Sequence, residues 1–217
     1  MDIKILYDNE ALAGFQKGWG FACLIEIDQY KVLFDTGDGP DFLDNLGKFE
    51  INPDELQHVI LSHPHFDHMG GLLHLLERNS NCTVYIPTFF PIQFKIRLMS
   101  YCKTWETFGF EQILEHIYVD TAKNHIYEQY CLVDLGEQFF IITGCAHPGL
   151  DVILSRAKSI GKPILGVLGG FHGFENLDSL KELSFIAPCH CTSLKNHILK
   201  RFPNTGHHCA AGTSFHF

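Results

Sequence analysis

Hydrophobic and polar positions along the first part of the chain predict short strands. Apolar residues concentrate at Ile3 to Tyr7, Phe21 to Ile27 and Tyr30 to Phe34, and the polar pair Asp28-Gln29 separates the last two runs. Two strand-like runs joined by two polar residues are typical of a hairpin. We therefore predict that the chain opens with a β-meander.

The pattern then changes to helices alternating with strands. Residues 41–49 predict a helix, and Asn52-Pro53-Asp54 predicts a turn. Apolar runs at 58–61 and 82–87 predict strands, and the leucines from Leu72 onward have helical spacing. These elements complete a first half that ends near residue 87.

Residues 88–128 show no clear hydrophobic period, although aromatic side chains crowd into them. Two interpretations remain open for this aromatic insertion, which are a lid over a site and additional core. We favour the interpretation as additional core, because large aromatic side chains stabilise a fold mainly by being buried.

From residue 130 onward the pattern becomes regular again. Residues 130–135 and 138–142 predict a hairpin around Gly136-Glu137, and a unit of strand, histidine-containing loop and helix then occurs three times. The strands are predicted at 139–142, 164–168 and 185–187, the loops carry His147, His172 and His190, and the helices are predicted at 150–159, 177–183 and 193–202. Such alternation predicts parallel βαβ units, which place all three histidine loops at one edge of a sheet.

Composition fits a globular chain of 217 residues that is 46% apolar. We expect one domain, residues 1–217, with halves at about 1–87 and 129–217 and the insertion between them. The net charge of −9 disfavours a nucleic-acid partner. No apolar run approaches a membrane span and the start lacks a signal-peptide pattern, so we expect a cytoplasmic protein without a membrane partner. The oligomeric state stays open.

Eight cysteines are spread along a chain of this size, which predicts mostly reduced thiols rather than a disulfide framework. Cys189 and Cys191 flank His190, but the paired spacing of a zinc knuckle is absent. Because neighbouring side chains of an extended segment point to opposite faces, we expect both cysteines to point away from a metal at His190 and to pack or hydrogen-bond.

The segment with the clearest chemistry is His63-Pro64-His65-Phe66-Asp67-His68, which places four metal-ligand types in six positions. It directly follows an apolar strand, and Pro64 disfavours a helical conformation at His63. Imidazole and carboxylate ligands together suit Zn²⁺, Fe or Mn²⁺ rather than Ca²⁺. The sequence therefore predicts a metal site where this strand ends.

This motif, H-x-H-x-D-H, resembles the first motif of the metallo-β-lactamase superfamily, and Phe34-Asp35-Thr36-Gly37 resembles the early D-T-G loop of that family. The resemblance covers essentially the whole chain. It implies an α/β fold, a four-layer αβ/βα sandwich of two mixed β-sheets flanked by helices.

Later motifs narrow the resemblance. The combination T-G-C-A-H-P-G, G-G-F-H and P-C-H-C-T is similar to a subgroup of 7,8-dihydropterin-6-yl-methyl-4-(β-D-ribofuranosyl)aminobenzene 5′-phosphate synthases and related metal-dependent hydrolases. Because one fold hosts many chemistries, such motifs identify a substrate poorly.

The resemblance also implies the metal ligands. One metal is expected at His63, His65 and His147, and a second at Asp67, His68 and His190. Cys145 follows a glycine where the family usually has a bridging aspartate, so bridging as a thiolate, a place beside the metals and no role all remain open for it.

Two further residues are assigned roles around the metals. Metal-bound imidazoles usually donate their second N–H to a carboxylate or carbonyl, and Asp35 is the candidate for that contact. His172 is the candidate for an active-site acid, base or phosphate contact, with a structural hydrogen bond as the alternative. His207, His208 and His216 are expected at the surface or in strands.

The expected function is that of a hydrolase that binds one or two Zn²⁺ ions, with Mn²⁺ or Fe as alternatives, and attacks a small phosphate- or ester-containing substrate with a metal-activated water. Asp67 would orient that water, His172 would protonate the leaving group, and Lys95 and Arg97 are candidates for a substrate phosphate. Two alternatives remain open. One is the synthase activity of the subgroup, and the other is a non-catalytic metal or ligand sensor.

Overall fold

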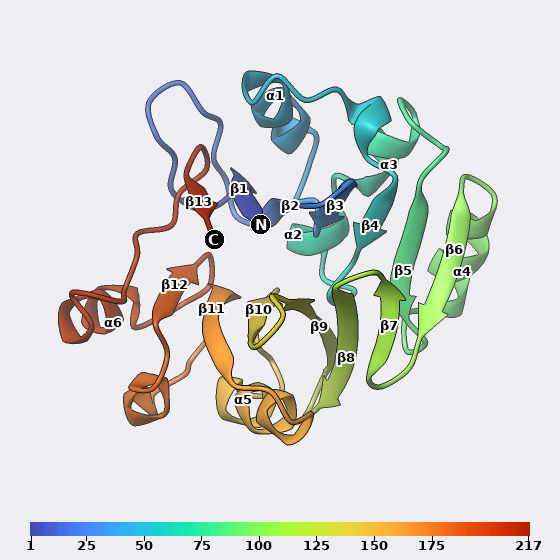
Figure 1. Cartoon of the computed structure of the whole chain (residues 1–217). Coiled ribbons are helices and arrows are strands. Elements are labelled where there is room, and N and C mark those ends of the chain that lie inside the picture. Colours follow the sequence, from blue (N-terminus) through green and yellow to red (C-terminus); the bar gives the residue numbers. More distant parts are fainter. The chain divides into compact units, whose positions relative to one another are not determined.

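The structure, a computed structural model, describes all residues from 1 to 217. The chain divides into two compact units, which are residues 1–107 with 210–217 and residues 108–209. Each unit contains one mixed β-sheet (Figure 1). Two mixed sheets with helices packed on them confirm the predicted α/β fold class.

The first unit holds a seven-stranded sheet in the order β13-β1-β2-β3-β4-β5-β6. Its strands are β1 (Asp2–Tyr7), β2 (Ala22–Ile27), β3 (Tyr30–Phe34), β4 (His58–Ile60), β5 (Thr83–Pro87), β6 (Lys103–Thr107) and β13 (Ser214–His216). The first three strands run antiparallel, which confirms the β-meander, and β3 to β6 run parallel. Parallel pairing makes the loop after β4 leave the sheet at the edge where β3 also ends.

Four helices and a 3-10 turn complete the first unit. They are α1 (Asp41–Lys48), η1 (Pro53–Glu55), α2 (Phe66–Met69), α3 (Leu72–Leu76) and α4 (Ile92–Met99). Leucines of α1 and α3 pack with Leu24, Leu33 and Val59 of the sheet in one buried cluster. The helix predicted at 41–49 and the helix start predicted at Leu72 are therefore confirmed, because an apolar helical face was the signal for both.

The second unit holds a six-stranded sheet in the order β12-β11-β10-β9-β8-β7. Its strands are β7 (Glu111–Leu114), β8 (Ile117–Lys123), β9 (Tyr127–Asp134), β10 (Phe139–Thr143), β11 (Ile164–Gly170) and β12 (Phe185–Cys189). The hairpin predicted around Gly136-Glu137 is confirmed by the antiparallel pair β9 and β10. Strands β10, β11 and β12 are parallel neighbours, so the loops after them begin at one edge of this sheet.

Helix α5 (Leu150–Ser159), the 3-10 turn η2 (Leu177–Leu180) and helix α6 (Lys195–Arg201) follow those three loops. Ile153 of α5, Leu180 of η2 and Ile198 of α6 share one buried cluster with Ile141 and Val167 of the sheet. The predicted strand–loop–helix unit therefore occurs three times, with one correction. The helix predicted at 177–183 is a short 3-10 turn.

The aromatic insertion is more regular than its sequence pattern indicated. Residues 88–128 contain α4, β6, β7 and β8 as well as the start of β9, and the boundary between the two units falls inside them, after Thr107. The core interpretation holds for Phe90, which is buried, with Phe94 packed beside it. It is wrong for Trp105 and Phe108, which are 51% and 70% exposed.

The two ends of the chain meet in the first unit, where N and C are marked close together in Figure 1. Strand β13 pairs antiparallel with β1, and the backbones of Met1 and Phe217 hydrogen-bond to each other. The sequence pattern indicated β13 only through the expectation that His216 lies at the surface or in a strand, because a strand of three residues is stabilised by its partner rather than by its own composition. None of the helices combines the length and the apolar character that crossing a membrane requires.

Candidate metal centre

The H-x-H-x-D-H segment of the first unit is held by Asp35, which follows β3. Asp35 is fully buried and lies in the left-handed backbone region with φ 56°. Its carboxylate accepts hydrogen bonds from the backbone N–H and the hydroxyl of Ser62, both 2.7 Å long, and lies 2.7 Å from Nδ1 of His68. A buried carboxylate that receives the Nδ1–H of an imidazole fixes the tautomer, so that Nε2 of His68 is left with its lone pair.

The first two histidines of the segment lie against each other. Nδ1 of His63 is 2.9 Å from the Ser62 hydroxyl, and Nε2 of His63 is 3.0 Å from Nδ1 of His65. Two nitrogen ligands of one tetrahedral zinc ion would lie roughly 3.4 Å apart, from Zn–N bonds of about 2.05 Å. The spacing of these two ring nitrogens is therefore close to the one that a shared ion needs.

Helix α2 carries the last two residues of the motif. Oδ2 of Asp67 lies 3.8 Å from Nε2 of His68, the ring nitrogen that does not contact Asp35. The backbone carbonyl of His68 accepts hydrogen bonds from the N–H and the hydroxyl of Thr36, at 2.8 and 3.1 Å. The D-T-G loop thus holds both the His68 side chain, through Asp35, and the His68 backbone, through Thr36.

Gly71 allows the D-T-G loop to come this close. A Cβ at Gly71 would lie 2.2 Å from the carbonyl oxygen of Thr36 and 2.6 Å from that of Gly39. Both neighbours are backbone atoms, which cannot rotate away. The glycine after the motif therefore serves close packing of two backbone segments rather than an unusual backbone angle.

In the second unit, Glu128 of β9 organises the loop that follows β10. This fully buried carboxylate accepts hydrogen bonds from the backbone N–H groups of Cys145, Ala146 and His147, at 2.8, 2.9 and 2.8 Å. It also accepts one from the hydroxyl of Thr143 at 3.1 Å. Sequence reasoning missed Glu128. The available signal was a charged Glu128, next to Gln129, inside a strand whose other residues up to Val133 are apolar or aromatic.

The loops after β11 and β12 hold the other two histidines of this edge. His172 and His190 both adopt left-handed backbone angles, with φ 46° and 45°. The ring of His172 lies 4.9 Å from the ring of His147, edge to face, and its carbonyl accepts the N–H of Ser193. His190 is buried. The expected meeting of histidines from the second half is thus realised between His147 and His172.

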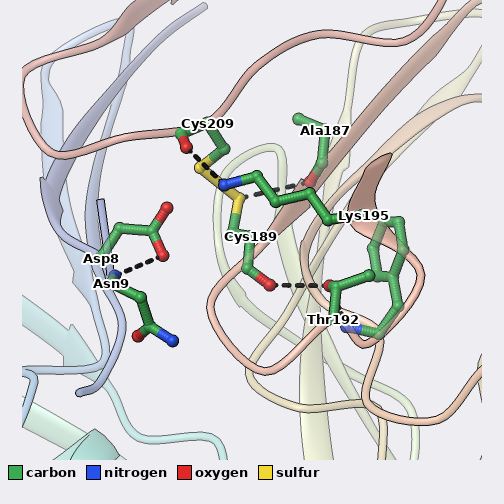
Figure 2. The surroundings of a disulfide bond; sticks show 8 residues. Asp8, Asn9, Ala187, Cys189, Thr192, Lys195 and Cys209 are labelled. Atoms are coloured by element: carbon green, nitrogen blue, oxygen red, sulfur yellow. Dashed lines mark hydrogen bonds between the residues drawn. A yellow bond between two sulfur atoms is a disulfide. The ribbon is translucent and has the colours of Figure 1, made fainter. Parts of the chain in front are cut away.

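The cysteines beside His190 correct two expectations. Cys189 forms a disulfide with Cys209, whose carbonyl accepts a hydrogen bond from Nζ of Lys195 at 2.9 Å (Figure 2). The expectation that most cysteines are reduced is confirmed, because six of the eight take part in no disulfide, but the expectation that Cys189 only packs or hydrogen-bonds is wrong. Cys191 does not point away from His190, because the left-handed angle at His190 ends the extended segment on which alternation depends.

An open pocket of about 440 Å³ lies beside His147 and His172 in the second unit. Phe171 and Phe174 give it an aromatic part, and Asp151, Glu175 and Asn176 give it polar groups. Its lining includes neither Lys nor Arg. His147 and His172 are therefore accessible to a small molecule, on a surface that offers no lysine or arginine to an anion.

Three other residues considered in the sequence, Lys95, His207 and His216, make contacts of their own away from the motif residues. Lys95 is buried and donates hydrogen bonds to the carbonyl of Thr88 and the carboxylate of Glu106, at 3.0 and 2.7 Å. Its charge is therefore paired with Glu106 rather than offered to a substrate phosphate. His207 stacks on Phe185 with ring centres 4.2 Å apart, and its burial lowers its pKa. His216 lies 2.8 Å from the carboxylate of Asp2.

The first unit offers histidines and one aspartate, and the second unit, taken by itself, offers histidines and cysteines. Each of these donor types suits a borderline cation such as Zn²⁺. Asp35 and Ser62 supply the supporting contacts that metal-bound imidazoles usually have. On the chemistry of their donors, the residues fit a metal centre.

Comparison with known proteins identifies the class. The family model of the metallo-beta-lactamase superfamily matches residues 20–189. The chain therefore belongs to the metallo-β-lactamase superfamily. The matched range begins before the D-T-G loop and ends at Cys189, so it covers every predicted ligand except His190.

Two relatives and one solved structure resemble the chain over most of its length. It is 29% identical to uncharacterized protein MJ0448 of Methanocaldococcus jannaschii, over 89% of this chain and 91% of that protein. It is 26% identical to the 7,8-dihydropterin-6-methyl-4-(beta-D-ribofuranosyl)-aminobenzene-5′-phosphate synthase of the same organism, over 89% of each. The crystal structure of Tm1679, a metal-dependent hydrolase of the beta-lactamase superfamily, matches with a TM-score of 0.83 and 25% identity, over 100% of this chain and 99% of the other. The chain thus has the fold of metal-dependent hydrolases.

Proposed function

We propose that this protein is a metal-dependent hydrolase that attacks a small phosphate- or ester-containing substrate with a metal-activated water. The observation that carries the proposal is the orientation of the motif histidines. Asp35 and the Ser62 hydroxyl contact Nδ1 of His68 and of His63, so Nε2 is the atom with which each imidazole would bind an ion. Metal-bound imidazoles usually have such a hydrogen-bond partner at their second ring nitrogen, and here two neighbouring imidazoles have one.

The family resemblance assigns His63, His65 and His147 to one ion and Asp67, His68 and His190 to a second. Zn²⁺ is our first choice, and Mn²⁺ or Fe would suit the same nitrogen and oxygen donors. When bound, such an ion makes water nucleophilic at neutral pH and polarises the bond to be broken. One or two ions are both compatible with this donor set.

The residues of this chain would contribute the remaining steps. The Asp67 carboxylate would accept a proton from the attacking water and keep it oriented toward the substrate. His172 lines the pocket beside His147, and its imidazole would give a proton to the leaving group. A proton thus leaves the nucleophile at Asp67 and another reaches the leaving group from His172.

The pocket bears on the choice of substrate. Asp151 and Glu175 contribute negative charge to its lining, which contains no Lys or Arg. A phosphate in this pocket would depend on the metal ions for its neutralisation, whereas a carboxylic ester or lactone would need no cation there. The pocket therefore favours an uncharged ester or lactone over a phosphomonoester.

Metal content and turnover together test the proposal. The purified chain should contain one or two Zn²⁺ ions and hydrolyse at least one member of a panel of esters, lactones and phosphodiesters. Chelation should remove the activity, and Zn²⁺ should restore it. His63→Ala should lose activity and bind less metal than the unmodified chain, whereas the same change at exposed His74 should keep both the activity and the metal content. Tightly bound metal without hydrolysis of any panel member would contradict the proposal.

A synthase activity is the second candidate, and the 26% identical synthase relative favours it. In that reaction the same residues would bind a pterin and a ribofuranosyl-aminobenzene phosphate and join them rather than cleave an ester. Incubation of the metal-loaded protein with these two substrates, with chromatographic detection of the condensed product, separates the two functions.

A further inference from the structure

Three metal-ligand side chains gather within the second unit in a combination that the hydrolase assignment does not use. They are Cys145, in the loop after β10, and His190 and Cys191, in the loop after β12. A ligand atom from each lies within 4.8 Å of the other two. Neither cysteine takes part in a disulfide.

We propose that Cys145, His190 and Cys191 form a thiolate-rich site for a borderline or soft cation, with Zn²⁺ as its first occupant. This inference deepens the proposed function and rests on it in one respect, the assignment of His190 to a metal. The new element is that sulfur atoms would also bind that ion. The thiol pair itself is argued from contacts inside the second unit.

Distances support this assignment. In a tetrahedral zinc site with Zn–S bonds of about 2.3 Å, two sulfur ligands lie roughly 3.8 Å apart. A mutual separation below 4.8 Å is therefore closed by small side-chain rotations.

The backbone around the three residues is shaped for this approach. Gly170 at the end of β11 has no side chain, and a Cβ there would lie 2.7 Å from Sγ of Cys191 and 2.4 Å from the carbonyl oxygen of Gly144. Sγ of Cys191 lies 3.9 Å from the carbonyl oxygen of Cys145. The left-handed angle at His190 turns Cys191 to the same side as the imidazole.

The neighbouring residues also separate this pair from the disulfide. Cys189 is bonded to Cys209 and therefore cannot compete for Cys191 or Cys145. The buried carboxylate of Glu128 binds the backbone N–H of Cys145 and fixes that residue in its loop.

Cobalt substitution tests the site directly. The full chain, stripped of metal and loaded with Co²⁺, should show the charge-transfer absorption of a thiolate–cobalt bond. Cys145→Ser and Cys191→Ser should each weaken this band, and the double variant should abolish it. Each single change should also lower the affinity for Cd²⁺ by about tenfold or more, because a hydroxyl is a poorer ligand than a thiolate for a soft ion.

Cys102→Ser is the matched control, because Cys102 is also a free, half-buried cysteine but belongs to the first unit. It should leave the band unchanged. X-ray absorption of the zinc-loaded unmodified chain adds a measurement without substitutions and should find sulfur bound to zinc. Stoichiometric zinc with only nitrogen and oxygen neighbours would overturn the proposal.

The two proposals can fail separately. A His63→Ala/His65→Ala variant should lose hydrolysis but keep the thiolate band. Retained hydrolysis with no sulfur around the ion would overturn the thiolate site alone. A thiolate band in a chain that hydrolyses nothing on the panel would overturn the hydrolase alone.

Discussion

Asp35 lies at the centre of the contacts that organise the metal motif. Its buried carboxylate binds Ser62 and His68 together: Oδ1 accepts the backbone N–H of Ser62, and Oδ2 contacts both the Ser62 hydroxyl and Nδ1 of His68. The sequence identified it through a rule about what metal-bound imidazoles need, and its bond to Nδ1 of His68 is the contact that this rule requires. Its effect on metal binding is a prediction.

Asp35→Asn should weaken zinc binding by about 10- to 100-fold, the usual loss when a carboxylate behind a metal-bound histidine is removed. The amide keeps the size of the side chain but offers one acceptor in place of two. Competition with a chromophoric chelator measures the affinity. Asp38→Asn, in the same loop, keeps an acceptor for the Tyr7 hydroxyl and should bind zinc normally. Equal affinities for both variants and the unmodified chain would remove Asp35 from the metal centre.

His58 predicts a pH dependence of stability. It is half-buried on β4 beside Tyr30 and Tyr85, and burial, followed by the charge of Lys103, lowers its pKa. A folded chain that resists protonation of a group binds fewer protons than the unfolded chain. Stability from His58 is therefore complete above about pH 6.5, its unfolded pKa, and is lost as the pH falls below that value.

The free energy of unfolding should fall between pH 7.5 and pH 5. In His58→Gln this fall should be smaller than in the unmodified chain, by an amount below about 1 kcal/mol. Urea unfolding at the two pH values measures it. His74→Gln removes an exposed histidine of α3 and should leave the pH dependence unchanged. If the first variant kept the full pH dependence, His58 would not be one of its sources.

At the scale of elements, the packing of α2 and α3 against the D-T-G loop rests on a close backbone approach. Gly71→Ala should lower the free energy of unfolding by about 2 kcal/mol or more, because its Cβ would meet the Thr36 and Gly39 carbonyl oxygens. Gly47→Ala in α1 should instead raise it by about 0.5–1 kcal/mol, because open space surrounds Gly47 and alanine favours a helix. Chemical denaturation of both variants tests this pair, and effects of the same sign would contradict it.

Elements with a regular apolar face were the ones that sequence predicted well. Helix α5 was predicted with the bounds that it has, and the three histidine loops follow three parallel strands as expected. Residues 88–128 were harder, because exposed aromatics such as Trp105 and Phe108 obscure the alternation between buried and exposed positions that defines a strand.

For the whole molecule, the Cys189–Cys209 disulfide closes a loop across 20 residues of the second unit. A crosslink over that length restricts the unfolded chain and contributes about 3 kcal/mol. Cys209→Ser should therefore lower the free energy of unfolding by about that amount, whereas Cys102→Ser should change it by less than about 1 kcal/mol.

Thiol titration checks the disulfide without any substitution. The denatured chain should expose six reactive thiols before reduction and eight after it, since two of the eight cysteines are paired. Eight thiols before reduction would show that the pair is reduced in the protein as prepared, and the stability prediction would then fail as well.

The sequence by itself determined the fold class, the strand–loop–helix units and the identity of the histidine loops, because each depends on a local pattern of apolar faces, turns and ligand spacing. Tertiary structure alone decided the contacts made by Glu128, the disulfide of Cys189 and the side to which Cys191 points. Glu128 lies 17 residues from Cys145 along the chain, and Cys209 lies 20 from Cys189. Such contacts form only when neighbouring strands bring distant loops to one edge, and a single backbone angle at His190 then sets the direction of Cys191.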